Sequence, residues 1–418
     1  MKTIKFYDTC SLLIAGESLF EEGIPFMISS ITLEELQNIK DSPTKAPDIK
    51  YSARLLLQLF EKFPNLGEII IHKTEYENII RQYGYSLTND TKILSDIHFI
   101  SKKLSDDYNF IFVTNDLNLK LIAQTILYCP IESVKLDEDD YTGYIEIYPN
   151  EEELARFYSN PKKNPYNLKI GQYLLIRDFY TKNIIDIRAW TGSEHRFLNY
   201  NNLNSNWFGK IKPYDNDPYQ KLLCDSLNNN KITMVKGPAG SGKTYLSLAY
   251  LMSEMEHGRL DKIIVFCNTI ATANSAKLGF YPGTRDEKLL DSQIGNLLIS
   301  KFGGREGVER LMSENKLVLL PMSDIRGYDT TGMRAGVYIS EAQNLDRTLI
   351  KLALQRIGED CICIIDGDEK TQVDDIHFSG NNNGMKRVSK VYRGHNIYGE
   401  VTLKNIYRSQ IAKIAELI

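Results

Sequence analysis

A chain of 418 residues is too long for one ordinary hydrophobic core, so two or three domains are expected. Its 42% hydrophobic and 25% charged residues are typical of a folded globular protein, and no apolar run approaches the roughly 20 residues of a membrane-spanning helix. A net charge of -4 gives no bulk signal for nucleic-acid binding, so any such site has to come from local basic patches.

The N-terminus and the cysteines predict a cytoplasmic location. Asp8 interrupts any apolar segment after Lys2 and Lys5, so the first residues do not resemble a secretory signal. The six cysteines are scattered and include no CxxC pair, so we expect reduced thiols and no zinc site.

Residues 1–145 alternate short apolar runs with helical patterns, which predicts a parallel sheet with helices. The expected strands are residues 4–7, 26–29, 69–71 and 110–114. Four carboxylates lie at the ends of strands or the starts of helices: Asp8, Glu35, Asp90 and Asp116. Oxygen ligands without histidine or cysteine suit Mg²⁺ or Mn²⁺. Two such ions can activate water and stabilise the leaving oxygen of a phosphodiester, so the four acids are candidate catalytic metal ligands.

The residue pattern also allows a structural role for each of these acids. Glu35 stands three residues after Thr32, as in a capping box, and the adjacent Glu34 competes with it for a metal role. Asp90 suits the N-terminus of a helix, and its rival Asp96 lies six residues further along that helix. The last of the four acids could cap the helix that follows it.

The order of these acids resembles that of PIN domains, a nuclease fold in which four acids arrive in the same sequence. The matching motifs are Asp8-Thr9, Glu35-Leu36, Asp90-Thr-Lys-Ile93 and Thr114-Asn-Asp116. The run Thr114–Leu121 followed by Tyr141-Thr-Gly143 further resembles PIN domains fused to PhoH ATPases. The resemblance covers most of residues 3–145 and implies metal-dependent cleavage by the four acids.

Residues 146–212 are rich in asparagine and aromatic residues, and they contain both tryptophans of the chain. The stretch Tyr173–Phe179 is typical of a strand, so we expect a small β-rich connector. Its aromatic residues alternate with arginine and lysine. They could grip single-stranded nucleic acid by stacking on bases, or they could simply fill a small core. The pair Trp207-Phe208 is the most direct test of the stacking hypothesis.

A glycine-rich segment follows the apolar run at 232–235 and precedes a helical pattern at 245–255, which is the setting of a phosphate-binding loop. Its backbone amides can surround a phosphate, and the helix directs its positive end at the same anion. Lys243 can reach the β- and γ-phosphates of ATP, and the Thr244 hydroxyl can bind Mg²⁺. The candidate ATP-binding residues are Gly237, Pro238, Ala239, Gly240, Ser241, Gly242, Lys243 and Thr244.

Two acidic motifs follow later strands of this region. The apolar run 335–339 leads into Glu341, our candidate for the base that orients the attacking water, and Gln343, a candidate γ-phosphate sensor. The same run could be only a strand followed by the start of a helix. The next strand, 361–365, ends in Asp366-Gly-Asp368. Carboxyl ends of parallel strands meet at one edge of a sheet, where ligands bind in open α/β folds.

Residues 213–418 resemble the PhoH family of P-loop ATPases, which are RecA-like and related to superfamily-one helicases. The matching segments are Gln220, Gly279–Lys288, Ile325–Gly327, Glu341–Asn344, Arg356–Gly358, Gly367-Asp368 with Gln372, and Arg408-Ser409. The resemblance implies that Gln220, Gln343 and Arg356 help to bind ATP, and that the chain forms homo-oligomers, with hexamers expected.

Arginines supply positive charge where the γ-phosphate leaves. Arg408 is the first candidate for this role, with Arg356 second and Arg326 third, although each could be a surface or helix-capping arginine. If these arginines reach the site of a neighbouring chain, the protein works as a ring.

The chain departs from the PhoH pattern at two places. Ser340 stands where the family has aspartate; serine can bond to a metal-bound water but brings no negative charge. Asp366 or Asp368 could compensate, and Asp368 is our candidate metal ligand. The arginine–proline pair of the family is replaced by Cys267-Asn268, without a clear consequence.

Together these features predict an α/β protein with three parts: a PIN-like nuclease at 1–145, an aromatic-rich connector at 146–212 and a P-loop ATPase at 213–418. We expect an RNA-processing enzyme in which an ATP-driven helicase motor feeds single-stranded or structured RNA to a metal-dependent endoribonuclease. One alternative is an oligomeric ATP-binding scaffold with little hydrolysis, and another is a nuclease–ATPase that acts on DNA. No membrane partner is expected.

Overall fold

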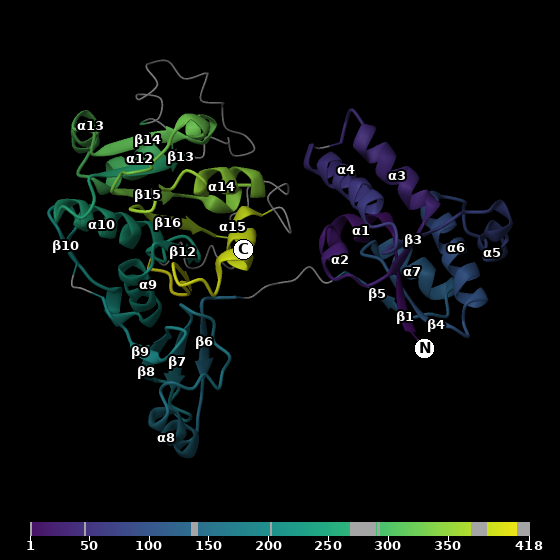
Figure 1. The fold of residues 1–418 in the computed structure, drawn as a ribbon, viewed down its shortest axis with the longest axis horizontal. Coiled ribbons are helices and arrows are strands. Elements are labelled where there is room, and N and C mark those ends of the chain that lie inside the picture. Colours follow the sequence, from purple (N-terminus) through teal and green to yellow (C-terminus); the bar gives the residue numbers. More distant parts are fainter. Residues whose placement is uncertain are drawn as a thin grey trace. The chain divides into compact units, whose positions relative to one another are not determined.

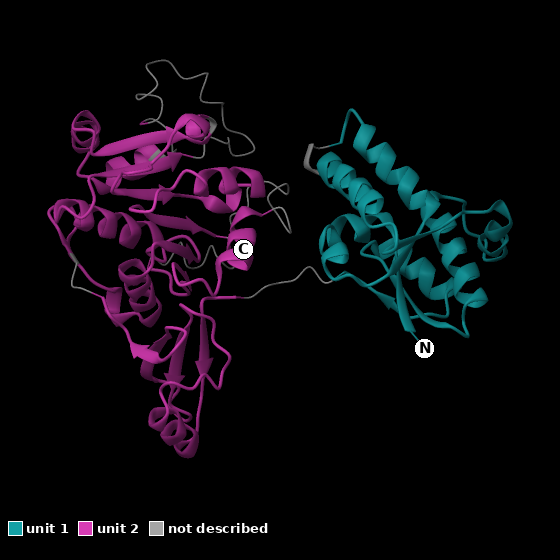
Figure 2. Cartoon of the chain, in the orientation of Figure 1, with its two compact units in different colours: residues 1–138 teal, residues 139–418 magenta. Residues whose placement is uncertain are grey.

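The computed structural model describes residues 2–45, 47–134, 141–200, 203–267, 290, 293–368 and 383–407. The chain divides into two compact units, residues 1–138 and 139–418 (Figure 2). No helix among the described residues combines the length and the apolar character needed to span a bilayer.

The first unit contains a five-stranded parallel sheet in the order β3-β2-β1-β4-β5 (Figure 1). Its strands are β1 (Lys2–Tyr7), β2 (Phe26–Ser29), β3 (Gly67–Ile70), β4 (Tyr108–Val113) and β5 (Ile131–Glu132). Its helices are α1 (Thr9–Ala15), α2 (Ser18–Glu21), α3 (Ser30–Asp41), α4 (Pro47–Lys62), α5 (Asn78–Gln82), α6 (Asn89–Lys103) and α7 (Leu117–Ile126), with the 3₁₀ helix η1 (Thr74–Glu77). The parallel sheet agrees with the prediction from the alternating pattern.

Alternate residues of the central strands point to opposite faces of this sheet, so the unit has two core layers. Phe6 and Phe112 pack on one face with Ile93 of α6. Tyr7 and Val113 pack on the other face. Helices therefore cover both faces, as a parallel sheet requires. Because Tyr7 pairs with Val113 in register, the residues that follow β1 and β4 emerge side by side at one edge of the sheet.

The second unit contains a six-stranded parallel sheet in the order β14-β13-β15-β16-β12-β17 (Figure 1). Its strands are β12 (Ile232–Lys236), β13 (Lys262–Cys267), β14 (Leu317–Pro321), β15 (Ala335–Ile339), β16 (Ile362–Gly367) and β17 (Tyr398–Thr402). The described helices around it are α9 (Pro218–Asn229), α10 (Lys243–Glu256), α12 (Gln293–Lys301), α13 (Arg305–Ser313), α14 (Arg347–Leu354) and α15 (Gly384–Tyr392).

This sheet is also buried on both faces. Val235 and Tyr338 belong to a core layer that includes Leu248 of α10, whereas Ile339 and Ile365 belong to the layer that includes Ile350 of α14. The strand β12 that precedes the glycine-rich loop lies between β16 and β17.

The predicted connector is built mainly of strands and shares the core of the second unit. A four-stranded sheet has the order β6-β7-β8-β9, and a hairpin joins β10 to β11. These elements are β6 (Tyr144–Ile147), α8 (Glu151–Ser159), β7 (Tyr173–Arg177), β8 (Ile184–Trp190), β9 (His195–Phe197), β10 (Leu203–Ser205) and β11 (Gly209–Ile211). Tyr173 and Ile211 pack in the same core layer as Val235 of the large sheet. Strand β6 crosses the boundary predicted at 145/146, because sequence composition does not report strand pairing.

The segment Tyr141-Thr-Gly143 joins the start of β6 to the edge strand β17. The Thr402 amide donates to the Thr142 carbonyl at 2.9 Å. The Lys236 Nζ atom donates to the Tyr141 carbonyl at 3.0 Å and lies 2.7 Å from a carboxylate oxygen of the buried Glu400. Gly143 has a φ of 82°, and an added Cβ would lie 1.6 Å from the Glu400 carbonyl oxygen. Only glycine therefore allows the two backbones to approach this closely.

Gly143→Ala is expected to destabilise the second unit by about 2–4 kcal/mol, since the methyl group adds an overlap with backbone to the strain of a positive φ. Gly258→Ala is the matched control, because Gly258 has a φ of 72° and its Cβ would meet no described atom within 4 Å. The control should cost only about 1 kcal/mol. Urea unfolding of the full chain measures the free energy of unfolding of both variants. Equal decreases in that free energy would contradict a close approach at Gly143.

Candidate functional site

The first candidate site lies where β1 and β4 end. Asp8 follows β1, and its side chain is buried. One carboxylate oxygen accepts from the Ser11 amide at 2.6 Å, which caps α1, and the other accepts from the Thr114 hydroxyl at 2.6 Å. Thr114 follows β4, so the two neighbouring strands hold the Asp8 carboxylate between them.

The three other predicted acids lie around Asp8. Asp116 caps α7 by accepting from the Leu119 amide at 2.9 Å. The Glu35 carboxylate on α3 accepts from the Thr9 hydroxyl and, at 3.0 Å, from the amide of Asn89.

The Asp90 side chain lies in the first turn of α6. Burial raises the pKa of Asp90, and the charges of Glu35, Asp116 and Asp8 raise it further. Burial likewise raises the pKa of Asp8, with a contribution from Asp116. The structure thus brings all four predicted acids into one electrostatic neighbourhood.

The chemistry of this cluster fits a divalent cation. Its ligand atoms would all be carboxylate oxygens, and their mutual repulsion is what a bound Mg²⁺ or Mn²⁺ offsets. As the side chains stand, no three His, Cys, Asp or Glu residues in the described part of the chain converge closely enough to hold a metal ion. Ligation therefore requires the carboxylates to rotate inward.

The structure bears on the structural roles that the residue pattern allowed for these acids. Helix α3 is capped by Ser29, and the buried Thr32 hydroxyl finds no hydrogen-bond partner among the described residues, so the capping-box reading of Glu35 is wrong. Glu34 is exposed. Helix α6 is capped by Thr88, and Asp90 lies in its first turn, where its charge suits the helix N-terminus as the alternative predicted. The fourth acid caps its helix, in addition to its place in the cluster.

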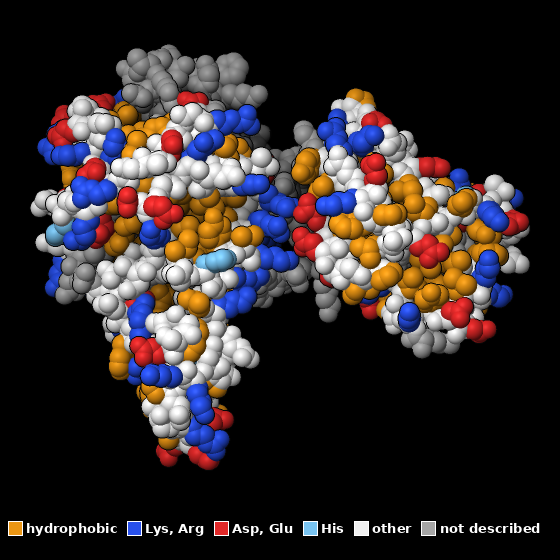
Figure 3. Space-filling model, in the orientation of Figure 1, with side chains coloured by type: hydrophobic (Ala, Val, Ile, Leu, Met, Phe, Trp, Pro, Cys, Tyr) orange, Lys and Arg blue, Asp and Glu red, His pale blue; other side chains and the backbone are white. Residues whose placement is uncertain are grey.

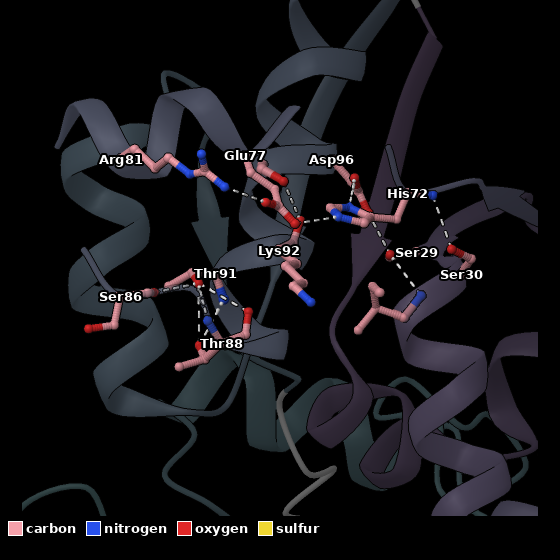
Figure 4. Close-up of polar contacts among 12 residues, drawn as sticks. Ser29, Ser30, His72, Glu77, Arg81, Ser86, Thr88, Thr91, Lys92 and Asp96 are labelled. Atoms are coloured by element: carbon pink, nitrogen blue, oxygen red, sulfur yellow. Dashed lines mark hydrogen bonds and ion pairs between the residues drawn. The ribbon is translucent and has the colours of Figure 1, made fainter. Parts of the chain in front are cut away.

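Asp96, the rival of Asp90, belongs to a different network. It is fully buried, accepts from the Ser29 hydroxyl at 2.6 Å and lies 2.7 Å from Nδ1 of His72. The contacts run on through Glu77 to Arg81 (Figure 4). This network links the ends of β2 and β3 to α6 and η1, which is a structural role.

Asp8→Asn is expected to stabilise the first unit at neutral pH while keeping the cap on Ser11. Because the pKa of Asp8 is raised in the fold, its ionisation costs stability as the pH rises from about 3.9, the ordinary aspartate value, towards the folded pKa. Asparagine avoids this cost, so the transition temperature should rise by a few degrees at pH 7, and the gain should vanish below about pH 3.9. Saturating Mg²⁺ should stabilise the wild type more than the variant.

Thermal unfolding of the full chain, followed at pH 3.5 and pH 7, measures this gain. Asp107→Asn is the control, because Asp107 is exposed and precedes the other end of β4. A lower transition temperature for Asp8→Asn than for the wild type at pH 7 without metal would contradict the repulsion.

The second candidate site is the loop between β12 and α10. Gly237, Gly240 and Gly242 adopt φ values of 141°, 83° and 97°, which other residues rarely adopt. Pro238, Ala239 and Ser241 complete the turn, with the Ser241 amide bonded to the Pro238 carbonyl. Such a turn before the N-terminus of α10 is typical of a loop that binds a phosphate.

Two side chains fix this loop. The Lys243 Nζ atom donates to the carbonyls of Gly237 at 2.5 Å and Pro238 at 3.0 Å, so the ammonium lies over the loop. Gln220 of α9 donates from Nε2 to the Ser241 carbonyl at 2.9 Å. A Cβ on Gly242 would lie 2.8 Å from that nitrogen. Gln220 therefore supports the loop directly. Its role in binding ATP stays a prediction.

The carboxyl ends of β15 and β16 face this loop through Asp366, which the sequence offered as an alternative to Asp368. One Asp366 oxygen accepts from the Thr244 hydroxyl at 3.1 Å and from the Tyr338 hydroxyl at 2.5 Å. The other accepts from the Glu341 amide at 3.2 Å. Val235 of β12 is in register with Asp366, but only the strand order reveals that neighbourhood.

Glu341 and Gln343 lie together at this edge. The Gln343 side chain donates to the Glu341 carboxylate at 2.6 Å and accepts from the Asp368 amide at 3.1 Å. Glu341 holds a positive φ of 52°, an uncommon backbone conformation that functional residues sometimes adopt. The carboxylate that contacts Thr244 is that of Asp366, whereas Asp368 as the metal ligand stays a prediction.

Of the three predicted arginines, the structure describes Arg356 and Arg326. Arg356 follows α14, and its carbonyl accepts from the Thr330 hydroxyl at 2.6 Å. This contact places the Arg356 backbone near the amino ends of β15 and β16, whereas the P-loop lies at the carboxyl end of the same sheet. Arg326 is exposed after β14. Arg408, Gln372 and residues 279–288 lie outside the described residues.

The pair Trp207-Phe208 packs in part against the core, which is the structural alternative to stacking on bases. Both side chains are half-buried against the buried Phe302. The aromatic residues that are exposed in this part of the chain include Tyr148, Tyr158, Phe179, Tyr180 and Phe197. Lys182 lies 5.0 Å from the Phe179 ring centre, and Arg188 lies 3.4 Å from that of Phe197. Figure 3 shows Lys and Arg side chains gathered in patches on the second unit, beside acidic and apolar groups.

The profile of the PhoH-like protein family matches residues 210–418, half of the chain, and that of the PIN domain family matches residues 6–127. Protein PhoH2 of Bacillus subtilis is 26% identical over 452 aligned residues, which cover 99% of each chain. Protein PhoH2 of Thermobispora bispora is 30% identical over 199 residues, which cover 47% of this chain and 44% of the relative.

Among solved structures, the crystal structure of VapBC2 from Rickettsia felis bound to a DNA fragment contains a similar chain. The match covers 31% of this chain and 98% of the VapBC2 chain. The two sequences are 21% identical, and the TM-score is 0.22. The two family profiles agree with the motifs and the order in which they occur. The chain therefore belongs to the PhoH family and places a PIN domain ahead of its PhoH domain.

Proposed function

We propose that the chain is an ATP-dependent ribonuclease in which an RNA helicase motor delivers unpaired RNA to a metal-dependent cleavage site. The observation that carries this proposal is the presence on one chain of both a four-carboxylate cluster and a complete phosphate-binding loop. A nuclease that needs an unpaired substrate gains from a motor that removes pairing.

In the cleavage site, Asp8, Glu35, Asp90 and Asp116 would hold Mg²⁺ or Mn²⁺, which supplies water activation and stabilises the leaving oxygen. The chain's own polar groups contact two of these acids. Thr114 donates to Asp8, and Thr9 and Asn89 donate to Glu35, so a metal ion would draw the carboxylates away from some of these partners.

In the ATPase site, the loop from Gly237 to Thr244 would bind the phosphates of ATP, and Thr244 would bind Mg²⁺. Glu341 would orient the attacking water, with Gln343 bonded to its carboxylate. A homo-oligomer, arranged as a hexameric ring, is the assembly we propose. It rests on membership of the PhoH family.

Cleavage of matched single-stranded RNA and DNA, with ATP turnover recorded in the same samples, tests the proposal. We expect RNA to be cut in a metal-dependent way and to stimulate ATP hydrolysis. Cleavage of DNA alone would support the DNA-directed alternative, whereas nucleotide-dependent assembly without turnover would support the scaffold alternative.

A further inference from the structure

The ATPase site has lost one carboxylate and holds another in an unexpected place. Ser340 replaces the aspartate of the PhoH pattern at the end of β15. Its hydroxyl is buried beside the hydroxyl of Tyr338. A serine here brings no negative charge towards a cation beside Thr244.

The neighbouring strand places Asp366 at the same level of the sheet. Ile339 of β15 pairs with Ile365 of β16, so Ser340 and Asp366 follow in register. Residues in register on adjacent strands point to the same face, about 4.8 Å apart. The preceding pair, Ile339 and Ile365, belongs to the α14 layer, so the next pair points to the face covered by α10. A carboxylate at Asp366 therefore lies one strand spacing away from a carboxylate at position 340.

That spacing brings the carboxylate to the phosphate-binding loop. Strand β16 lies between β15 and β12, and Asp366 is in register with Val235 of β12. The Asp366 side chain is 2% exposed and meets the Thr244 hydroxyl at 3.1 Å. Thr244 is the residue whose hydroxyl would bind Mg²⁺ in a loop of this kind.

Two further hydrogen bonds hold the Asp366 carboxylate in place. The Tyr338 hydroxyl, fully buried on β15, donates to the oxygen that also meets Thr244. The Glu341 amide donates to the other oxygen at 3.2 Å, which ties Asp366 to the residue that would orient water. A carboxylate held by three donors is preorganised for a single geometry.

We propose that Asp366 supplies the carboxylate that holds the magnesium of bound ATP beside Thr244, in place of Ser340. This inference rests on the proposed ATPase function. It also assigns to Tyr338 the role of a positioning residue, since its hydroxyl orients the Asp366 carboxylate.

The magnesium dependence of ATP affinity tests this assignment without relying on turnover. Binding of a fluorescent ATP analogue to the full chain would be measured with excess Mg²⁺ and with a chelator. We expect Mg²⁺ to tighten binding to the wild type, and Asp366→Asn to reduce that gain by about 10- to 100-fold. The double variant Ser340→Asp/Asp366→Asn should recover the gain, because it returns a carboxylate to β15.

Three further variants test whether the loss of the magnesium gain is specific to the Asp366 carboxylate. Asp360→Asn, at an exposed position before β16, is the matched control. Asp368→Asn tests the other carboxylate and should keep the magnesium gain. Tyr338→Phe should lose part of it, because the phenol no longer orients Asp366, and this variant serves if Asp366→Asn does not fold.

The outcomes separate this inference from the proposed function. If Asp366→Asn keeps the full magnesium gain, or Asp368→Asn loses it, the assignment is wrong while ATP binding stands. If the wild type does not bind the analogue with Mg²⁺ present, both the assignment and the ATPase function are overturned.

Discussion

Lys243→Ala is expected to slow ATP hydrolysis by roughly 100- to 1,000-fold, because it removes the charge closest to the transferred phosphate. In the structure the Lys243 ammonium lies over the loop, bonded to the carbonyls of Gly237 and Pro238. Phosphates bound there would replace those carbonyls as its partners. Steady-state phosphate release by the full chain, with and without RNA, measures the effect.

Lys231→Ala is the matched control for this variant. Lys231 precedes the other end of β12 and pairs with Glu359 at the surface, a contact of little energetic value. Its substitution should leave turnover unchanged. Hydrolysis by Lys243→Ala at the wild-type rate would show that the loop does not perform the observed turnover.

Asp116→Asn is expected to lower RNA cleavage by roughly 100-fold or more, because the cluster loses one charge that a metal ion needs. Asparagine caps helices as well as aspartate does, so the bond to the Leu119 amide and helix α7 should survive. The unchanged stability would separate a chemical loss from an unfolded domain. Cleavage of end-labelled single-stranded RNA with Mg²⁺ or Mn²⁺ gives the rate.

Asp107→Asn again serves as the control, since Asp107 is exposed and precedes the opposite end of β4. Cleavage by Asp116→Asn at the wild-type rate would place the metal ligands elsewhere. ATP turnover by Asp116→Asn should match the wild type, because the ATPase residues belong to the second unit.

The fold class followed directly from local patterns. Apolar runs separated by helical segments predict parallel sheets, and the five-stranded and six-stranded sheets are both parallel. The glycine-rich loop was predictable because every chemical requirement lies within eight consecutive residues. The cluster of Asp8, Glu35, Asp90 and Asp116 depended instead on the resemblance to PIN domains, since each acid alone also suits a cap or a turn.

What the sequence could not show depends on strand order and register. Asp366 and Asp368 are equivalent in a one-dimensional pattern, and only the pairing of β16 with β12 places Asp366 next to Thr244. Arg356 matched a family motif, yet its place near the amino ends of the strands appears only in three dimensions. Trp207 offered aromatic and basic neighbours for stacking, but its contact with Phe302 appears only in three dimensions.

The most direct test of coupling between the two sites is cleavage of a labelled RNA that has a duplex stem and a single-stranded tail. The substrate would be incubated with Mg²⁺ or Mn²⁺, with and without ATP, alongside the Lys243→Ala and Asp8→Asn proteins. We predict that ATP extends cleavage from the tail into the stem, that Lys243→Ala cuts only the tail, and that Asp8→Asn cuts neither. Cleavage that is indifferent to ATP and to Lys243 would contradict a motor that feeds the nuclease.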